Sequence, residues 1–151
     1  MGAGFCQQRL FTSQFMCAMR AGHPRIKDKL TLDQFQSESH LSVTTPGTGY
    51  ESLEKALETQ KVRRQIAMHV PSYLGVGTIV TETDYLVIVP GRYGRILASK
   101  GDLKLLPLPF SFPSYHVTQN WHERYTHDPA QQWLRSLIAN TFRETQKARR
   151  S

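Results

Sequence analysis

Short apolar runs alternate with segments of helical periodicity along this 151-residue chain. A short apolar run bounded by turn residues predicts a strand, whereas apolar residues three or four positions apart predict a helix. We therefore expect strands at residues 7–11, 14–20, 40–44, 65–70, 85–89, 103–106 and 115–121. We expect helices over residues 50–60, 73–82, 91–98 and from residue 129 onward. This alternation indicates an α/β fold with a mostly parallel sheet.

Capping signals mark where two helices begin. Thr31 and Gln34 have the spacing of a capping box, so a further short helix that carries Phe35 should start there. Asp128 can accept hydrogen bonds from the first turn of the last helix, and Pro129 suits the first helical position. Residues 107–113 contain three prolines, which remove donors and fix φ, so we expect an irregular connector there.

The last helix has a wide apolar face at helical spacing. Its members are Trp133, Leu134, Leu137, Ile138, Thr141 and Phe142. An apolar face of this kind faces the core of a folded protein. We therefore expect this helix to dock on a sheet through these side chains.

The composition is that of one folded domain without a membrane span. Hydrophobic residues make up 39% and aromatic residues 10% of the chain, which is enough for a core. No apolar run approaches the roughly 20 residues that a membrane helix needs. Cys6 and Cys17 lie in apolar, strand-like segments, which favours buried thiols in a reducing compartment over a disulfide. We expect a cytoplasmic protein.

The net charge of +7 is unevenly distributed. Residues 31–60 are acidic, whereas the basic excess lies at residues 61–64 and in the C-terminal tail. Neither basic segment interleaves aromatic with basic residues, as a groove for single-stranded nucleic acid does. The distribution therefore argues against direct DNA contact by this chain.

The sequence Thr-Thr-Pro-Gly-Thr-Gly-Tyr, which joins a predicted strand to a predicted helix, is the first candidate binding site. Gly47 and Gly49 leave the backbone N–H groups of Thr48, Gly49 and Tyr50 free to point at a ligand, and Thr45 adds a hydroxyl. A carboxylate or phenolate suits a helix N-terminus, which carries about half a positive charge. The alternative is a plain turn in which Thr48 caps the helix.

Pro71, Ser72 and Tyr73 form the second candidate site. Pro71 lies where a predicted strand leads into a helix, and Ser72 or Tyr73 can cap that helix and also face a ligand. The alternative is that Ser72 is only an N-cap.

Catalytic and metal-binding patterns are weak. Phe110, Phe112, Tyr115 and His116 surround the connector, where they line a site or, in our preferred interpretation, pack a hinge. We interpret His122 as a structural histidine, since no metal-binding spacing, P-loop or nucleophile motif accompanies it. We expect no enzyme, no metal and no cofactor.

A series of motifs follows in order along nearly the whole chain. The upstream motifs are H-P-R-I from His23, L-T-L-D-Q-F from Leu30, P-G-T-G-Y from Pro46, V-P-S-Y-L from Val70 and D-Y-L-V-I-V-P from Asp84. The last ones are Trp121-His122, Asp128-Pro129 and Trp133-Leu134-Arg135. This series resembles the LysR-type transcriptional regulators, in particular the branch that senses aromatic acids, nitroaromatics and plant flavonoids.

The resemblance implies the effector-binding domain of that family, an α/β fold similar to type 2 periplasmic binding proteins, with two subdomains and a ligand cleft between them. Residues 23–106 would form the second subdomain, and residues 1–22 and 107–151 the rest of an incomplete first one. DNA would be bound only through a helix-turn-helix domain, which this chain lacks. In that branch a histidine often stands at the position of Ser72 and contacts the aromatic acid, so we expect a different effector here.

The leading hypothesis is a domain that senses a small-molecule effector, an aromatic or planar acid, and that self-associates into dimers or tetramers. Its ligand-binding residues would be Thr45, Gly47, Thr48, Gly49, Tyr50, Pro71, Ser72 and Tyr73. The alternative is a truncated, ligand-free interaction module that pairs with intact regulators. An enzyme on the same fold would need a convergent acid–base pair, which the sequence does not offer.

Overall fold

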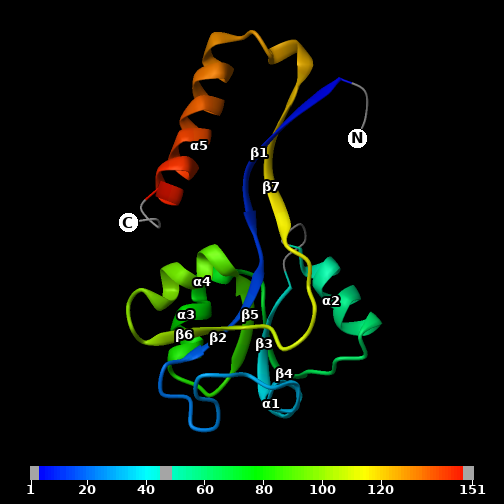
Figure 1. The fold of residues 1–151 in the computed structure, drawn as a ribbon, viewed down its shortest axis with the longest axis vertical. Coiled ribbons are helices and arrows are strands. Elements are labelled where there is room, and N and C mark those ends of the chain that lie inside the picture. The colour runs from blue at the N-terminus through cyan, green and yellow to red at the C-terminus, as the bar shows by residue number, and fades with distance from the viewer. Residues whose placement is uncertain (1–3, 45–48, 148–151) are drawn as a thin grey trace. The chain divides into compact units, whose positions relative to one another are not determined.

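The computed structural model describes residues 4–44 and 49–147, which belong to two compact units. Unit 1 comprises Met1–Ser13 and Ser114–Ser151, and unit 2 comprises Gln14–Pro113. Each unit contains both strands and helices (Figure 1), so the predicted α/β class is confirmed. None of the described helices is long and apolar enough to cross a membrane.

Unit 2 is built on a five-stranded sheet with the strand order β4-β3-β5-β2-β6. The strands are β2 (Phe15–Arg20), β3 (Ser39–Val43), β4 (Gln65–Val70), β5 (Leu86–Pro90) and β6 (Leu103–Pro107). β3 pairs in parallel with β4 and β5, whereas β2 runs antiparallel between β5 and β6. The sheet is therefore mixed, although every strand except β2 runs in the same direction.

β2 occupies a different place from the one that the sequence analysis assigns to it. The sequence analysis puts both opening strands in the first subdomain, but β2 is hydrogen-bonded inside the sheet of unit 2. Cys17, Ala18 and Met19 are fully buried, as a strand covered on both faces requires. The apolar run of β2 indicates burial, but it does not specify the sheet in which the strand lies.

Helices cover both faces of this sheet (Figure 1). α2 (Tyr50–Thr59) lies on one face, and α3 (Val76–Thr81) and α4 (Gly91–Ala98) lie on the other. The 3₁₀ turn η1 (Tyr73–Gly75) leads into α3. The apolar core of unit 2 includes Ala18, Leu41, Val43, Val76, Val80, Val87, Val89 and Leu103.

The predicted capping box of α1 (Leu32–Ser37) is confirmed. Thr31 Oγ1 accepts a hydrogen bond from the Gln34 N–H at 3.2 Å, and Gln34 Oε1 accepts one from the Thr31 N–H at 3.0 Å. The helix also buries the side chain of Phe35 completely.

Buried polar residues lie at the edge of the sheet where β3 and β5 begin. His23 is fully buried, with Nδ1 3.2 Å from the Ile26 N–H nitrogen and Nε2 3.0 Å from the Asp84 carbonyl oxygen. Nδ1 therefore accepts from the Ile26 N–H, and Nε2 donates to the Asp84 carbonyl. Arg25 donates to both carboxylate oxygens of Glu38 at 2.6 and 2.7 Å, which lowers the pKa of Glu38.

Unit 1 consists of β1 (Phe5–Ser13), β7 (Tyr115–His122), the 3₁₀ turn η2 (Glu123–Tyr125) and α5 (Pro129–Lys147). β1 and β7 form an antiparallel two-stranded sheet, in which the register shifts between Arg9 and Phe11. α5 begins as predicted, because the Gln131 N–H donates to Asp128 Oδ1 at 2.8 Å.

The predicted orientation of α5 is wrong for much of its apolar face. Three large side chains of that face are exposed, namely Trp133 by 67%, Leu134 by 44% and Leu137 by 48%. α5 packs instead through the buried Ala139 and through Phe142, whose ring centroid lies 4.8 Å from that of Phe11. Because a two-stranded sheet is narrower than the apolar face, it covers only one side of that face.

Each unit contains one free cysteine. Cys17 in β2 is fully buried, as predicted, and burial raises the pKa of its thiol to about 12. Cys6 in β1 is only half-buried, because it lies on the two-stranded sheet, and its Sγ is 3.7 Å from Thr126 Oγ1.

Replacing Gly91 by alanine should lower the free energy of unfolding by about 1–3 kcal/mol. The Gly91 N–H donates to the Gln14 carbonyl oxygen at 2.7 Å, and a Cβ at position 91 would lie 2.8 Å from this oxygen. Gly75→Ala is the matched control, since a Cβ there would have no neighbour within 4 Å and its φ is −90°. Urea denaturation measures both variants, and equal midpoints would contradict the close approach at Gly91.

The free energy of unfolding should fall by up to about 3 kcal/mol as the pH decreases through the range in which His40 titrates. His40 is fully buried, donates from Nε2 to the Phe35 carbonyl at 2.6 Å, and has no partner for Nδ1 among the described residues. Burial lowers the pKa of its ring from 6.5 to about 4.

The sign follows from the order of the two pKa values. The unfolded chain binds the proton at higher pH, so the stabilisation is complete above pH 6.5 and is lost as the pH falls toward 4. Urea midpoints across this range, in the parent chain and in His40→Gln, measure the effect. An equal loss in both proteins would rule out His40 as its source.

Candidate functional site

Both predicted loops lie at one edge of the sheet of unit 2. Val43 and Val70 are register partners at the ends of the parallel strands β3 and β4, and the Thr44 N–H donates to the Val70 carbonyl at 3.0 Å. Ligands of open α/β sheets bind outside the carboxyl ends of the strands. We use the name carboxyl edge for the segments that follow β3, β4 and β5, of which residues 44, 49–50, 71–73 and 91–92 are described.

Gly49 and Tyr50 form the described part of the first loop, whereas Thr45, Gly47 and Thr48 lie outside the described residues. Gly49 is the N-cap of α2 and has a φ of 81°, in the left-handed region that favours glycine. No side chain of this N-cap binds the first N–H groups of α2. The N-terminus of α2 carries a partial positive charge, which attracts anions.

In the second loop, Ser72 is the N-cap of η1, since its Oγ accepts a hydrogen bond from the Leu74 N–H at 3.2 Å. Pro71 and Ser72 are exposed, whereas Tyr73 is half-buried. The ring centroids of Tyr73 and Tyr93 are 5.6 Å apart, and the Tyr93 hydroxyl donates to the Tyr73 carbonyl. Burial raises the pKa of Tyr93. Ser72 thus has the predicted capping role and is also accessible to a ligand, while Tyr73 helps to pack η1 against α4.

The sequence analysis missed the third segment of the carboxyl edge. β5 ends at Pro90 and α4 begins at Gly91, so Arg92 lies in the first turn of α4. α2 and α4 follow the neighbouring strands β3 and β5 and lie on opposite faces of the sheet (Figure 1). The chain leaves β3 toward one side of the sheet and leaves β5 toward the other side. The crevice between two such strands is the place where α/β folds bind ligands. The Pro-Gly pair after an apolar run was the available signal for this junction in the sequence. Only the strand order shows that the junction lies at the same edge of the sheet as the ends of β3 and β4.

Phe15 connects the first loop to the proline connector of residues 107–113. A Cβ at Gly49 would lie 3.1 Å from Phe15 Cζ, and the Phe15 ring meets the Phe112 ring edge-on with centroids 5.2 Å apart. A cavity of about 250 Å³ beside them is lined by Gln14, Phe15, Pro107, Leu108, Phe110, Ser111 and Phe112. The Gln60 side chain also binds the connector, because its Nε2 donates to the Ser111 carbonyl at 2.6 Å. The loop, the end of α2 and the connector are therefore packed together.

The aromatic residues expected around the connector belong to both units. Phe110 and Phe112 lie in unit 2, whereas Tyr115 and His116 lie in β7 of unit 1. Phe110 packs on Phe35 with ring centroids 5.4 Å apart. His116 Nδ1 is 2.9 Å from Thr12 Oγ1 of the paired strand. Phe110 and Phe112 therefore pack the connector against the rest of unit 2 and also line the cavity beside Phe15, while the role of the connector as a hinge stays a prediction.

Within residues 4–44 and 49–147, no three His, Cys, Asp or Glu side chains gather where they could hold a metal ion. His122 is the N-cap of η2, and its Nδ1 accepts a hydrogen bond from the Arg124 N–H at 3.2 Å. The structural interpretation of His122 is confirmed by this contact.

Comparison with known proteins gives one family and close relatives. The LysR substrate binding domain family matches residues 2–143 of the chain. The HTH-type transcriptional activator NagR of a Ralstonia species is 32% identical over 141 residues, and NahR of Pseudomonas putida is 34% identical over 139 residues. The alignments cover 93% and 92% of this chain but 47% and 46% of the two relatives. The chain therefore spans about half their length.

The fold is similar to that of a solved regulatory domain of a transcriptional activator. That structure is the regulatory domain of MexT, a transcriptional activator in Pseudomonas aeruginosa, with a TM-score of 0.75 and 27% sequence identity. The match covers 91% of this chain and 67% of that one. The sequence and the fold therefore lead to the same group of proteins.

Proposed function

This chain belongs to the LysR substrate-binding domain family, and we propose that it senses a small aromatic or planar acid for a transcriptional regulator. The proposed site is the carboxyl edge of unit 2. Its residues would be Gly49, Tyr50, Pro71, Ser72 and Tyr73, together with Thr45, Gly47 and Thr48.

The convergence of strand ends at the carboxyl edge is the observation that carries this proposal. The Thr44–Val70 hydrogen bond holds the first residue after β3 beside the end of β4. The N-terminus of α2, whose N-cap Gly49 has no side chain to bind it, would offer backbone N–H groups to a carboxylate. The oxygen of the exposed Ser72 hydroxyl accepts a hydrogen bond from the Leu74 N–H, and its O–H can donate a second hydrogen bond to a ligand.

A planar acid fits this combination of groups. Its carboxylate would take the N–H groups and the hydroxyl, and its ring would lie against the apolar parts of Tyr50 and Pro71. The matched relatives NagR and NahR are named as transcriptional activators. Together with the resemblance to the aromatic-acid-sensing branch, this favours an aromatic acid over other anions.

In the whole regulator, ligand binding would change transcription by favouring one of two conformational states. Self-association into dimers or tetramers and DNA binding through a helix-turn-helix domain outside this chain would carry that change to DNA. The named relatives are regulators, and we infer that this chain is likewise not an enzyme. Such a protein works where the DNA is, so we propose a cytoplasmic location.

Salicylate should bind the chain, and Ser72→His should tighten the binding by roughly 10-fold. An imidazole at this exposed position can donate a stronger hydrogen bond to a carboxylate than a hydroxyl can. The lost N-cap costs about 0.5–1 kcal/mol, which leaves the fold intact. Isothermal titration calorimetry with salicylate and other benzoic acids measures the affinity.

Thr59→His, at the other end of α2, is the control for a histidine placed elsewhere in unit 2, and it should leave the affinity unchanged. No heat of binding across the panel, from protein with a cooperative unfolding transition, would overturn the proposed ligand class. Equal gains in both histidine variants would overturn the proposed position.

A second candidate function is a ligand-free interaction module that pairs with intact regulators. The exposed side chains of Trp133, Leu134 and Leu137 on α5 favour it, because large apolar side chains that cluster on a surface often mark a protein contact.

Mixing the chain with a full-length homologue and measuring the mass of the oligomers by light scattering tests this function. Mixed oligomers are expected with the parent chain and with Gln132→Glu, but not with Trp133→Glu on the neighbouring position. If the parent chain and the homologue remain separate, the module hypothesis is wrong.

A further inference from the structure

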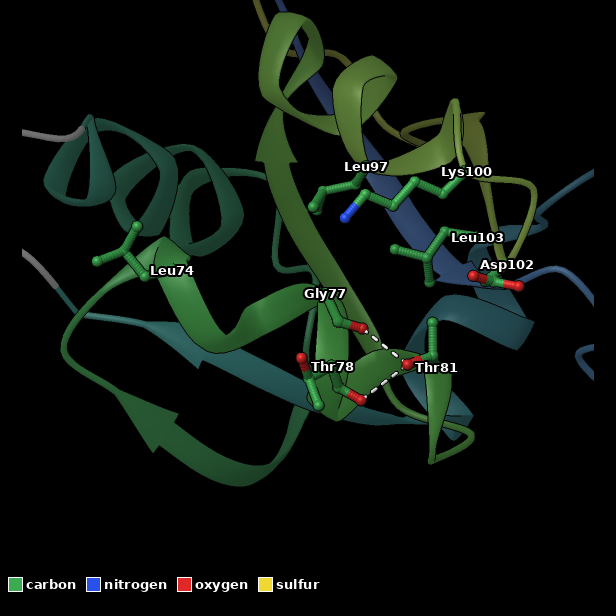
Figure 2. Close-up of a pocket in the computed structure, with 8 residues that line it drawn as sticks. All are labelled: Leu74, Gly77, Thr78, Thr81, Leu97, Lys100, Asp102 and Leu103. Atoms are coloured by element: carbon green, nitrogen blue, oxygen red, sulfur yellow. Dashed lines mark hydrogen bonds between the residues drawn. The ribbon is translucent and has the colours of Figure 1, made fainter.

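A second cavity of unit 2 lies between α3 and the turn that joins α4 to β6 (Figure 2). Its volume is about 240 Å³, which suits a ligand of few heavy atoms. Thr78 and Thr81 line it from α3, Leu97 from α4, and Lys100 and Asp102 from the turn. We call it the α3–α4 pocket.

The α3–α4 pocket extends from η1 away from the carboxyl edge. Thr81 is the last residue of α3, and Leu103, which also lines the pocket, pairs with Arg20 at the far end of β2. These residues and the turn with Lys100 and Asp102 lie toward the C-terminal ends of the helices, whereas the carboxyl edge lies at their N-terminal ends. Leu74 of η1, which follows Ser72 and Tyr73, is the lining residue nearest in sequence to the carboxyl edge.

Two leucine side chains form the apolar floor of the pocket, where α3 and α4 approach each other closely. Leu103 is 6% exposed and Leu97 is half-buried. Gly77 brings α3 near α4, and a Cβ at this position would lie 3.1 Å from Leu97 Cδ2. A larger residue than glycine would narrow the pocket, so its apolar floor depends on this position.

Charges of both signs stand at the rim. Gly101 has a φ of 86° and reverses the chain, so that Lys100 and Asp102 on either side of it both line the pocket. Figure 2 shows the Lys100 side chain extending past Leu97 toward α3, with Asp102 beside Leu103. The ion pairs found among the described residues do not include Lys100 with Asp102, so each charge can serve a ligand.

The C-terminal ends of α3 and α4 add a further negative contribution. Helix C-termini carry about half a negative charge and attract cations. A ligand with only a carboxylate would meet Lys100, but it would be repelled by Asp102 and by the helix ends. A ligand with only an amine would face the reverse conflict. A ligand that carries both charges satisfies both sides.

We infer that the α3–α4 pocket binds a small zwitterion with an apolar group, of the kind represented by a free aliphatic α-amino acid. Its carboxylate pairs with Lys100, its ammonium with Asp102, and its apolar group lies on Leu97 and Leu103. The Thr78 hydroxyl at the exposed rim adds a hydrogen bond. This inference does not rest on the proposed function, because Lys100, Asp102, Leu97 and Leu103 do not belong to the proposed effector site.

The test is a titration of the 151-residue chain with L-leucine, followed by amide chemical shifts in two-dimensional NMR. The amides of Gly77, Thr78 and Gly101 should shift and saturate with a Kd on the order of 1 mM, as expected for so small a ligand. The carboxylate analogue 4-methylpentanoate and the amine analogue 3-methylbutylamine should each bind at least roughly 5-fold more weakly. Either analogue binding as tightly as leucine would overturn the zwitterion assignment.

Two exposed positions give variants that keep the core intact. Lys100→Met should weaken leucine binding roughly 5-fold, and Thr78→Trp should fill the pocket and abolish the saturating shifts. Lys55→Met on α2, on the other face of the sheet, is the matched control and should bind leucine as the parent chain does.

Thr78→Trp also separates the two sites, since it should abolish leucine binding and leave salicylate binding unaltered. Leucine shifts that do not saturate, or that survive Thr78→Trp unchanged, would overturn the pocket as the binding site.

Discussion

The parallel pairing of β3 with β4 and β5 is the constraint on which the rest of unit 2 depends. Parallel strands cannot be joined by a tight turn, so the chain returns each time through a helix. Each return helix starts at the same edge, and the loops before α2, α3 and α4 are thereby collected at the carboxyl edge. The buried Leu41, Val43, Val87 and Val89 hold these strands in the core, so the position of the carboxyl edge follows from the packing of the sheet.

Local signals in the sequence predicted most elements correctly. The Thr31–Gln34 box and Asp128 with Pro129 specify helix starts through contacts within four residues, which do not depend on the remaining fold. The bounds of α4 were predicted to the residue, because the segment from Gly91 to Ala98 has helical spacing of its apolar residues and lies between two strands. The two loops of the proposed site could be predicted as strand-to-helix junctions, and the resemblance to a family suggested that they belong together.

Other features depend on partners distant in the sequence. The buried run of β2 fits any central strand, and only its pairing with β5 and β6 decides its sheet. Trp133 and Leu137 have the same helical period as buried residues, but the two-stranded sheet of unit 1 is too narrow to cover them. Arg92 became a candidate only through the strand order. The capping role of Ser72 is confirmed, whereas its contact with a ligand stays a prediction.

Each unit contains one of the two cysteines, so thiol labelling can follow the two units separately. A thiol buried completely inside a sheet reacts with an alkylating reagent only after the sheet has opened, so modification of Cys17 reports the opening of unit 2. The half-buried Cys6 reports on unit 1 in the same reaction. Because a bound ligand slows the opening of the unit that holds it, labelling kinetics followed by mass spectrometry would identify the liganded unit without any substitution in the chain.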